Sequence, residues 1–390
     1  MFKVKTYNAI SNKGLDRFDR NFYQVSADCE APDAYVLRSH KLHNETIPDS
    51  VKAIARAGAG VNNVPIDECT KAGVVVFNTP GANANAVKEL VLAGLLLSSR
   101  DIIGGMNYVQ SLTEMTDADE MGKLLEKEKK RFAGNELFGR TLGVVGLGAI
   151  GSMVADMALA LGMNVVGFDP ALSVEAAWKL PSQVEKMESL QALLSRSDYV
   201  TLHVPAIAPT RHMINGDVLQ SVKQGAVLLN FARESIVDAD AVVTSLEAGQ
   251  LGMYVCDFPE PILLNRADVL AMPHIGASTA EAEENCAVMA VEQVKDFLES
   301  GNIKNSVNFP QINLPRADGY RITFVNDNVS GVLGNVLSIF TENNINVLDM
   351  MNKSRDNIAY NIIDVEQMPS DSIVSAIRDV EHVMSVRVLN

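Results

Sequence analysis

The stretch TLGVVGLGAIGSMVADMALALGMNVVGFDP, residues 141–170, decides the fold because it predicts a strand, a glycine turn, a helix and a second strand. Its apolar start, LGVVG, is typical of a buried parallel strand. The run ends at Gly146-x-Gly148-x-x-Gly151. In such a turn the first glycine allows the tight bend, the second lets a pyrophosphate approach the backbone, and the third lets helix pack on strand. The helix that follows offers unpaired N–H groups to an anion.

An acidic residue follows this turn at an informative distance. The second apolar run, NVVGF, ends at Asp169, which lies 18 residues past Gly151. A carboxylate there hydrogen-bonds a ribose 2′-hydroxyl and repels a 2′-phosphate. A glycine turn alone joins strands and helices in many proteins, but the flanking elements and the acid together predict an NAD site.

The composition narrows the classes of partner. The chain has 390 residues, 47% of them apolar, which is enough for two or three domains with substantial cores. Its net charge of −15 argues against nucleic acid and anionic membranes as partners. The N-terminus lacks the apolar core of a signal peptide, and the longest apolar run, 90–97, is too short to span a bilayer. We therefore expect a soluble cytoplasmic protein.

The cysteines support the same expectation. They are scattered without the spacing of a metal site, so we predict no metal and a reducing compartment. The four are Cys29, Cys69, Cys256 and Cys286.

Strands and helices also alternate on both sides of the opening stretch. Before it we predict strands at 34–39, 52–58 and 73–78 and a helix through NANAVKELVLAGLLLSSRD, a doubly wound unit without a glycine fingerprint. After it we predict strands at 199–205, 226–232, 252–258 and 269–274. A long helix then begins near Ser278, a candidate N-cap, and stops at Gly301.

The last part of the chain changes character. Residues 306–317 are polar, carry prolines and are predicted to be a linker. Beyond them the order of predicted elements is strand, helix, strand, strand, helix, strand, which is the ferredoxin-like arrangement.

This order predicts that a Rossmann-type domain is inserted into a flavodoxin-like domain. We assign residues 1–100 and 278–305 to the outer, substrate-binding domain, 101–277 to the NAD-binding domain and 318–390 to the C-terminal module. We expect two α/β domains with doubly wound parallel sheets and an active cleft between them.

Candidate catalytic side chains follow the predicted strands of the NAD-binding domain. Arg233 follows one strand, Asp257 and Glu260 the next, and His274 the last. Hydride transfer from a 2-hydroxy acid needs a base, for which histidine is suited by its pKa. It also needs a cation for the substrate carboxylate, for which arginine is suited, and a carboxylate that orients the base. Taken singly, the histidine fits a cap, the arginine a surface ion pair, and Glu260 a plain loop.

Several motifs together resemble the D-isomer-specific 2-hydroxy acid dehydrogenase family. They are RAGAGVNNV, NTPGANANAVKEL, GRTLGVVGLGAIG, VVGFDP, LHVP, NFARESIVD, PHIGASTAEAEEN and NSVNFP. The resemblance implies that Arg233, Glu260 and His274 are catalytic. Besides Gly146, Gly148 and Gly151, it implies contacts to NAD from Ala149, Ile150, Asp169, Phe231, Ala232, Asp257, His274 and Gly276.

The resemblance also implies a substrate. The loops YVLRSHK and IARAGAG would hold it, through Arg38, Ser39, Lys41, Arg56, Gly58 and Gly60. The cations favour 3-phospho-D-glycerate, oxidised to 3-phosphohydroxypyruvate in the first step of L-serine biosynthesis. The alternatives are an unphosphorylated acid such as D-lactate or glyoxylate, or an NAD(H)-sensing regulator without turnover.

The C-terminal residues resemble an ACT domain, a regulatory module that binds small molecules. The resemblance implies L-serine as the ligand, at Asn328 and Asn346, between two subunits of a homo-oligomer, dimer or tetramer. Asn326, in the same motif after the predicted strand, is a further candidate, although relatives commonly carry histidine there. An assembly module without a ligand is the alternative. The basic run at 127–131 either reaches a neighbouring subunit's substrate or forms a solvated helix face.

Overall fold

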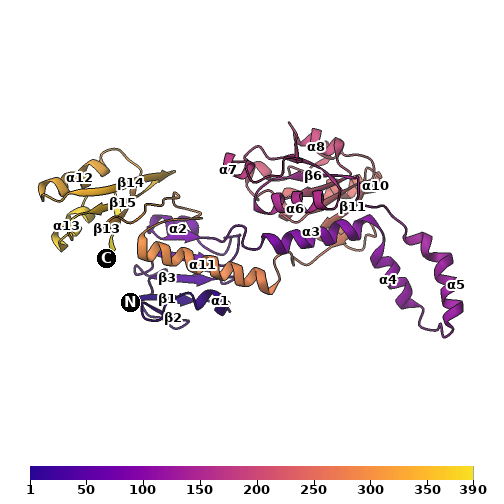
Figure 1. Ribbon diagram of the computed structural model, residues 1–390, viewed down its shortest axis with the longest axis horizontal. Helices are drawn as coiled ribbons and strands as arrows, with labels where there is room; N and C mark the ends of the chain where they lie inside the picture. Colours follow the sequence, from indigo (N-terminus) through magenta and orange to yellow (C-terminus); the bar gives the residue numbers. More distant parts are fainter. Residues whose placement is uncertain (390) are drawn as a thin grey trace. The chain divides into compact units, whose positions relative to one another are not determined.

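The computed structural model describes residues 1–389, apart from the side chain of residue 175. The chain forms two compact units (Figure 1). The first contains residues 1–83 and the chain from residue 280 onward, and the second contains residues 84–279.

The second unit is built on a seven-stranded parallel sheet in the order β12-β11-β10-β9-β6-β7-β8. This is the predicted Rossmann-type order, with β6 inside the sheet between β9 and β7. The strands are β6 (Thr141–Val145), β7 (Asn164–Phe168), β8 (Glu185–Lys186), β9 (Tyr199–Leu202), β10 (Ala226–Asn230), β11 (Leu251–Cys256) and β12 (Val269–Ala271).

Helices cover both faces of this sheet, as the connections between parallel strands require. They are α3 (Ala84–Ser99), α6 (Ala149–Ala160), α7 (Val174–Ala177), α8 (Leu190–Arg196), α9 (Gly216–Leu219) and α10 (Ala239–Glu247), with the short 3₁₀ turns η2 (Ala208–Thr210), η3 (Glu234–Ile236) and η4 (Pro261–Leu263). Two further helices and a 3₁₀ turn, α4 (Ile102–Ser111), α5 (Ala118–Glu128) and η1 (Lys129–Phe132), contain no buried residue.

The boundary between the units differs from the predicted one. We expected the chain to cross near residue 100, but α3 already belongs to the second unit. Its apolar residues Val87, Val91 and Leu95 share a buried cluster with residues of β6, α6 and β10. The helical spacing predicts α3 correctly, but it does not show which of two sheets the apolar face covers.

The first unit contains the predicted flavodoxin-like sheet, five parallel strands in the order β2-β1-β3-β4-β5. They are β1 (Phe2–Thr6), β2 (Tyr23–Ser26), β3 (Ala34–Leu37), β4 (Ala53–Arg56) and β5 (Val75–Phe77). The helices beside them are α1 (Asn12–Leu15), α2 (Ile66–Lys71) and α11 (Ala280–Ser300). In Figure 1 the orange α11 lies along the indigo and violet strands, because its buried face packs on β3 and β4. It begins at Ala280, so Ser278 is not its N-cap.

The predicted linker is a packed part of the first unit. Phe309, Ile312 and Leu314 are buried in its core. The buried Asn308 accepts from the backbone N–H of Val76 at 2.9 Å, and so extends the edge of β5. These apolar residues beside the two prolines indicate a packed segment, but the polar composition of the whole stretch concealed this indication.

The C-terminal module is a four-stranded antiparallel sheet in the order β14-β15-β13-β16, with two helices on one face. Its elements confirm the predicted order: β13 (Tyr320–Asp327), α12 (Val332–Glu342), β14 (Val347–Arg355), β15 (Ile358–Val365), α13 (Asp371–Arg378) and β16 (Val383–Leu389).

The other face of this sheet is joined to the rest of the first unit. Val325, Tyr360 and Ile362 share one buried cluster with residues of β1, β4 and α11. The fully buried Arg321 pairs with Asp364 at 2.7 Å and donates to the carbonyl of Ser300 at the end of α11. Arg321 also donates to the carbonyls of Leu314 and Pro315, so that all of its donors are used.

Candidate active site

The glycine turn after β6 has the geometry that an NAD pyrophosphate needs. Gly146 has a φ of +88°, and a β-carbon there would lie 2.7 Å from the carbonyl oxygen of His203. A β-carbon on Gly151 would lie 1.9 Å from the Gly146 oxygen, so only glycine fits. Gly148 is the N-cap of the twelve-residue α6. No atom lies within 4 Å of the position that a β-carbon on Gly148 would occupy. An anion can therefore approach the first turn of α6, which also carries Ala149 and Ile150.

Asp169 ties this turn to the end of β7. Its carboxylate accepts from the backbone N–H of Leu147 at 2.8 Å and of Ala171 at 2.9 Å. Each oxygen keeps a second lone pair, and the side chain is only partly buried. It is thus fixed at the edge of the glycine turn and still able to accept from a ribose hydroxyl.

The loop after β10 is held by the buried Asn230. Its amide donates to the carbonyl of Arg233 at 2.9 Å and accepts from the N–H of Ala232 at 3.1 Å. These bonds fix the backbone from which the Arg233 side chain projects. Phe231 is buried in the core, so a contact from this residue to NAD would have to come from its backbone.

The loop after β12 holds His274 in an uncommon conformation. Its φ of +56° is the left-handed region that side chains other than glycine and asparagine rarely adopt. The buried Asp257 accepts from the N–H groups of Ile275 and Gly276, both at 2.8 Å. Asp257 thus clamps the turn directly after His274, and both of its oxygens are engaged by backbone.

Phe258 brings two of the predicted catalytic residues together. The Arg233 guanidinium lies over its ring, 5.1 Å from the centroid. The His274 imidazole packs against the same ring, with centroids 4.4 Å apart. Phe258 was not among the predicted site residues, because a lone aromatic in CDFPEP has no polar group that indicates a role. Its place between Asp257 and Glu260 is the signal that could have indicated it.

Glu260 stands apart from this pair. It is exposed at the start of η4, and within the described chain no hydrogen bond or ion pair joins it to His274. The structure therefore brings Arg233 and His274 together but does not place the predicted carboxylate on the imidazole.

His203, at the end of β9, is a second residue that sequence analysis passed over. Its Nε2 lies 2.9 Å from the hydroxyl of Thr201, and its Nδ1 is buried without a hydrogen-bond partner among the described residues. Burial lowers the pKa of His203 to about 3, so the ring is neutral at physiological pH. Its backbone carbonyl lies against the glycine turn, whereas the side chain of His274 is exposed.

In the first unit, the predicted substrate cations gather at the carboxyl ends of β3 and β4. Nε of Arg56 donates to the carbonyl of Arg38 at 3.0 Å. The Arg56 guanidinium occupies the space beside Gly58, where a β-carbon would lie 2.1 Å from it. The N–H of Gly58 donates to the Arg56 carbonyl at 2.9 Å. The Arg56 guanidinium therefore fits beside Gly58 because this residue has no side chain. The Gly58 N–H already donates a hydrogen bond within the protein.

An acid from α11 reaches the same cluster. Glu283 forms an ion pair with Arg38 at 2.5 Å. Ser39 donates its backbone N–H to Asn8 at 3.1 Å, and Lys41 is exposed nearby in sequence. Gly60 is partly buried. Any anionic ligand of Arg38 would compete with Glu283.

The three asparagines of the C-terminal module differ in availability. Asn326 is buried; its amide donates to the Asp327 carbonyl and accepts from Asn361, at 2.6 and 2.7 Å. Asn328 and Asn346 are exposed, although the Asn328 amide donates to the Asp356 carbonyl at 3.1 Å. The side chain of Asn326 is used in hydrogen bonds within the sheet, whereas those of Asn328 and Asn346 are accessible to a ligand.

Residues 1–389 contain neither a membrane-spanning helix nor a metal-binding cluster. Their helices are too short or too polar to cross a bilayer. No three histidine, cysteine or acidic side chains of the described residues cluster in a way that could hold a metal ion.

Comparison with known proteins identifies the second unit. The family model described as D-isomer specific 2-hydroxyacid dehydrogenase, NAD binding domain, matches residues 104–276. This confirms the prediction of an NAD-binding domain around the glycine turn.

Relatives extend the similarity beyond this domain. A D-3-phosphoglycerate dehydrogenase of Methanocaldococcus jannaschii is 33% identical over 82% of this chain and 59% of its own length. A hydroxypyruvate reductase of Thermotoga maritima is 37% identical over 69% of this chain and 85% of its own. The solved structure of the TT0316 protein from Thermus thermophilus, with 29% identity, matches at a TM-score of 0.62 over 78% of this chain and all of that one.

The relatives differ from this chain in length. The chain spans 59% of the M. jannaschii protein and about half to three fifths of several other D-3-phosphoglycerate dehydrogenases.

Proposed function

We propose that this chain, which belongs to the D-isomer-specific 2-hydroxyacid dehydrogenase family, is an NAD-dependent dehydrogenase of 3-phospho-D-glycerate. It would form 3-phosphohydroxypyruvate, in the first step of L-serine biosynthesis. The observation that carries the proposal is the meeting of Arg233 and His274 on the ring of Phe258, in the unit that holds the glycine turn. The similarity to several D-3-phosphoglycerate dehydrogenases supports the choice of substrate.

His274 takes the proton of the substrate hydroxyl, since an exposed imidazole can exchange protons near neutral pH. Arg233 binds the substrate carboxylate through two N–H groups and polarises the carbonyl that forms. Asp257 keeps His274 in place through the backbone of Ile275 and Gly276. The glycine turn, α6 and Asp169 would hold NAD, which would supply the acceptor for the hydride of the substrate.

Glu260 is the third catalytic residue in this proposal. It would orient and stabilise the charged form of His274. Glu260 is exposed at the start of η4 and is not hydrogen-bonded to His274 in the described chain, whereas Arg233 and His274 already adjoin the same ring.

An NADH assay with a panel of substrates tests the function. The proposal predicts turnover of 3-phospho-D-glycerate far above that of D-lactate, glycerate or glyoxylate. Faster turnover of an unphosphorylated acid would favour the second candidate, which the similarity to a hydroxypyruvate reductase supports. NADH binding without turnover of any of them would favour the sensing regulator.

Asp169 should set the preference for NAD over NADP. We expect Asp169→Asn to keep the bond from the Leu147 N–H while removing the charge that repels a 2′-phosphate. Asp169→Ala should also weaken NAD binding, by about 10-fold, because a charge-assisted hydrogen bond is lost. Fluorescence titration with NADH and NADPH measures both changes. A wild-type protein that binds the two equally would show that Asp169 does not face the ribose.

The cations of the first unit should select for phosphate. Arg38→Ala and Arg56→Ala are each expected to raise KM for 3-phospho-D-glycerate by about 10- to 150-fold, the loss of one charge-assisted hydrogen bond. KM for a phosphate-free acid should change little. Glu283→Gln should lower KM for the phosphorylated substrate, since it releases Arg38. Arg20→Ala, an exposed change elsewhere in this unit, is the control. Equal losses for both acids would place these arginines on the carboxylate or in the fold.

We also propose that the C-terminal module is an ACT domain that binds L-serine and inhibits the enzyme. The exposed amides of Asn328 and Asn346 support a zwitterionic ligand, because amides donate and accept. We expect Asn346→Ala to raise the serine concentration for half inhibition by about 10-fold or more. Exposed Asn343→Ala is the control. Truncation is unsuitable because Tyr360 and Ile362 belong to the core of the first unit. Absence of inhibition at millimolar serine would leave an assembly module.

The chain is proposed to be a cytoplasmic homo-oligomer. Support comes from α4, which contains no buried residue and exposes Ile103, Met106 and Val109. Exposed apolar groups on one segment mark an interaction surface. In the nearby basic run, Lys129 and Arg131 pair with Glu126 and Glu128, which favours the solvated face over a role at a neighbouring substrate.

A further inference from the structure

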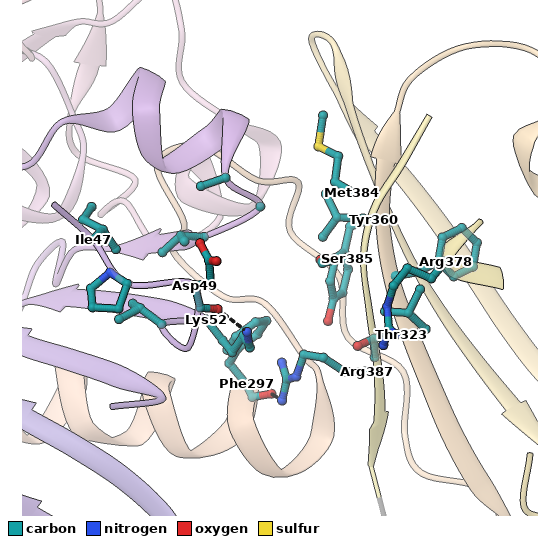
Figure 2. Close-up of a pocket in the computed structure, with 18 residues that line it drawn as sticks. Ile47, Asp49, Lys52, Phe297, Thr323, Tyr360, Arg378, Met384, Ser385 and Arg387 are labelled. Carbon is teal, nitrogen blue, oxygen red and sulfur yellow. Dashed lines mark hydrogen bonds between the residues drawn. The ribbon is translucent and has the colours of Figure 1, made fainter. Parts of the chain in front are cut away.

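A cavity lies within the first unit, where the C-terminal module meets the flavodoxin-like sheet. Its volume is about 300 Å³. Figure 2 shows Asp49 and Lys52 on one side and residues of β13, β15, β16 and α13 on the other, with Phe297 of α11 at the base. The size suits a small molecule, and the sites described above use none of the lining.

The charges around this cavity are mainly positive. Lys52, Arg378 and Arg387 line it, and Asp49 is the one acid among the described lining residues. A chain with a net charge of −15 thus gathers three cations from separate elements around one hollow. Burial and the charge of Arg387 lower the pKa of Lys52, and Asp33 and Asp49 oppose this effect. The Lys52 Nζ also donates to the Asp49 carbonyl at 2.6 Å.

Arg387 has hydrogen-bonding capacity left over. Its Nη2 donates to the carbonyls of Phe297 and Leu298 at 3.3 and 3.0 Å, and its guanidinium lies over the Phe297 ring at 4.5 Å. Its Nη1 is buried and has no partner among the described residues. An unpaired buried donor on a charged group is costly. Since Nη1 belongs to a residue that lines the cavity, an anion there would satisfy it.

The rest of the lining is suited to the organic part of such a ligand. Phe297 and Tyr360 supply aromatic surface, and Thr323 and Ser385 supply hydroxyl groups. The Tyr360 hydroxyl is committed to the Gly301 carbonyl at 2.9 Å. The cavity thus combines a cationic end with an apolar wall.

We propose that this cavity binds a phosphate-bearing small molecule, with its phosphate on Lys52, Arg378 and Arg387. The bound anion removes the repulsion between the cations and pairs with the open donor of Arg387. Because these groups come from both the flavodoxin-like part and the C-terminal module, the ligand holds the two together. This inference is independent of the proposed reaction, since no residue of the cavity belongs to the proposed active site.

Calorimetric titration with inorganic phosphate at constant ionic strength tests the proposal. The background is an Arg38→Ala/Arg56→Ala protein, so that the proposed substrate loop does not contribute. We expect saturable binding in the presence of saturating NADH, which occupies the glycine turn, and a thermal midpoint that rises with phosphate. Lys52→Gln and Arg378→Gln are each expected to weaken binding by about 10-fold or more. Arg378 is exposed, so its variant folds even if a change at Lys52 disturbs packing.

Lys186→Gln is the matched control, because this lysine is 81% exposed and lies in the other unit. A phosphomonoester with an aromatic group identifies the source of the anion. Tighter binding than inorganic phosphate indicates an organic ligand on Phe297 and Tyr360, and equal binding indicates free phosphate. The absence of saturable binding, or binding that neither cavity variant weakens, overturns the proposal.

Discussion

His274→Asn is expected to reduce turnover of 3-phospho-D-glycerate by about 10²- to 10⁴-fold, the usual contribution of a general base. Asparagine is the informative replacement because His274 has a φ of +56°, a conformation that asparagine adopts at a lower cost than alanine. Steady-state kinetics measure the loss. The NADH dissociation constant should stay nearly unchanged, because the variant removes a proton carrier and leaves the glycine turn intact.

His274→Ala serves as the second variant, and its NADH affinity and thermal midpoint report whether the turn has moved. His212→Asn is the matched control, since His212 also has a positive φ, +46°, and is exposed in the same unit. Retention of more than about a tenth of the wild-type rate in both His274 variants would mean that another group is the base, since such a group contributes at least about 10²-fold.

The sequence predicted the architecture well wherever one pattern dictates one structure. The turn after β6 requires glycine at Gly146 and Gly151, and the apolar runs around it are long enough to predict buried parallel strands. The prediction failed at α3, whose apolar face suits either sheet, and at residues 306–317, where composition concealed Phe309 and Ile312 in the core. Both errors concern tertiary partners, which local pattern does not specify.

The same distinction explains what was predicted of the site. Residue type and position after a strand indicated Arg233 and His274, and the structure brings them to one ring. They did not indicate Phe258, whose ring contacts both side chains through packing. They also did not indicate that Asp257 holds the turn after His274, because its partners are backbone N–H groups. Asn326 is polar and lies in a loop-like motif, yet the network with Asn361 buries it. Hydrogen-bond partners across strands are decided by the register of the sheet.

Arg233→Lys is expected to lower kcat/KM by about 10²-fold, although the charge is kept. Lysine offers a point charge in place of a planar fork, so it cannot bind a carboxylate through two parallel N–H groups. It also loses the packing of the guanidinium over Phe258. Arg233→Gln should cost more, about 10³-fold, since the charge that stabilises the developing carbonyl is removed as well. Steady-state kinetics with both variants measure the two steps.

The difference between the two variants separates geometry from charge. Asn230 holds the backbone of Arg233, so neither replacement should move the loop, and the NADH affinity should be preserved. Arg196→Gln, which breaks an exposed pair with Glu185 in the same unit, is the control and should leave kcat/KM unchanged. If Arg233→Lys retained the wild-type value, the carboxylate would not be held by two parallel bonds. If Arg233→Gln did so as well, the substrate carboxylate would lie on another cation, and the role of the pair around Phe258 would have to be reassigned.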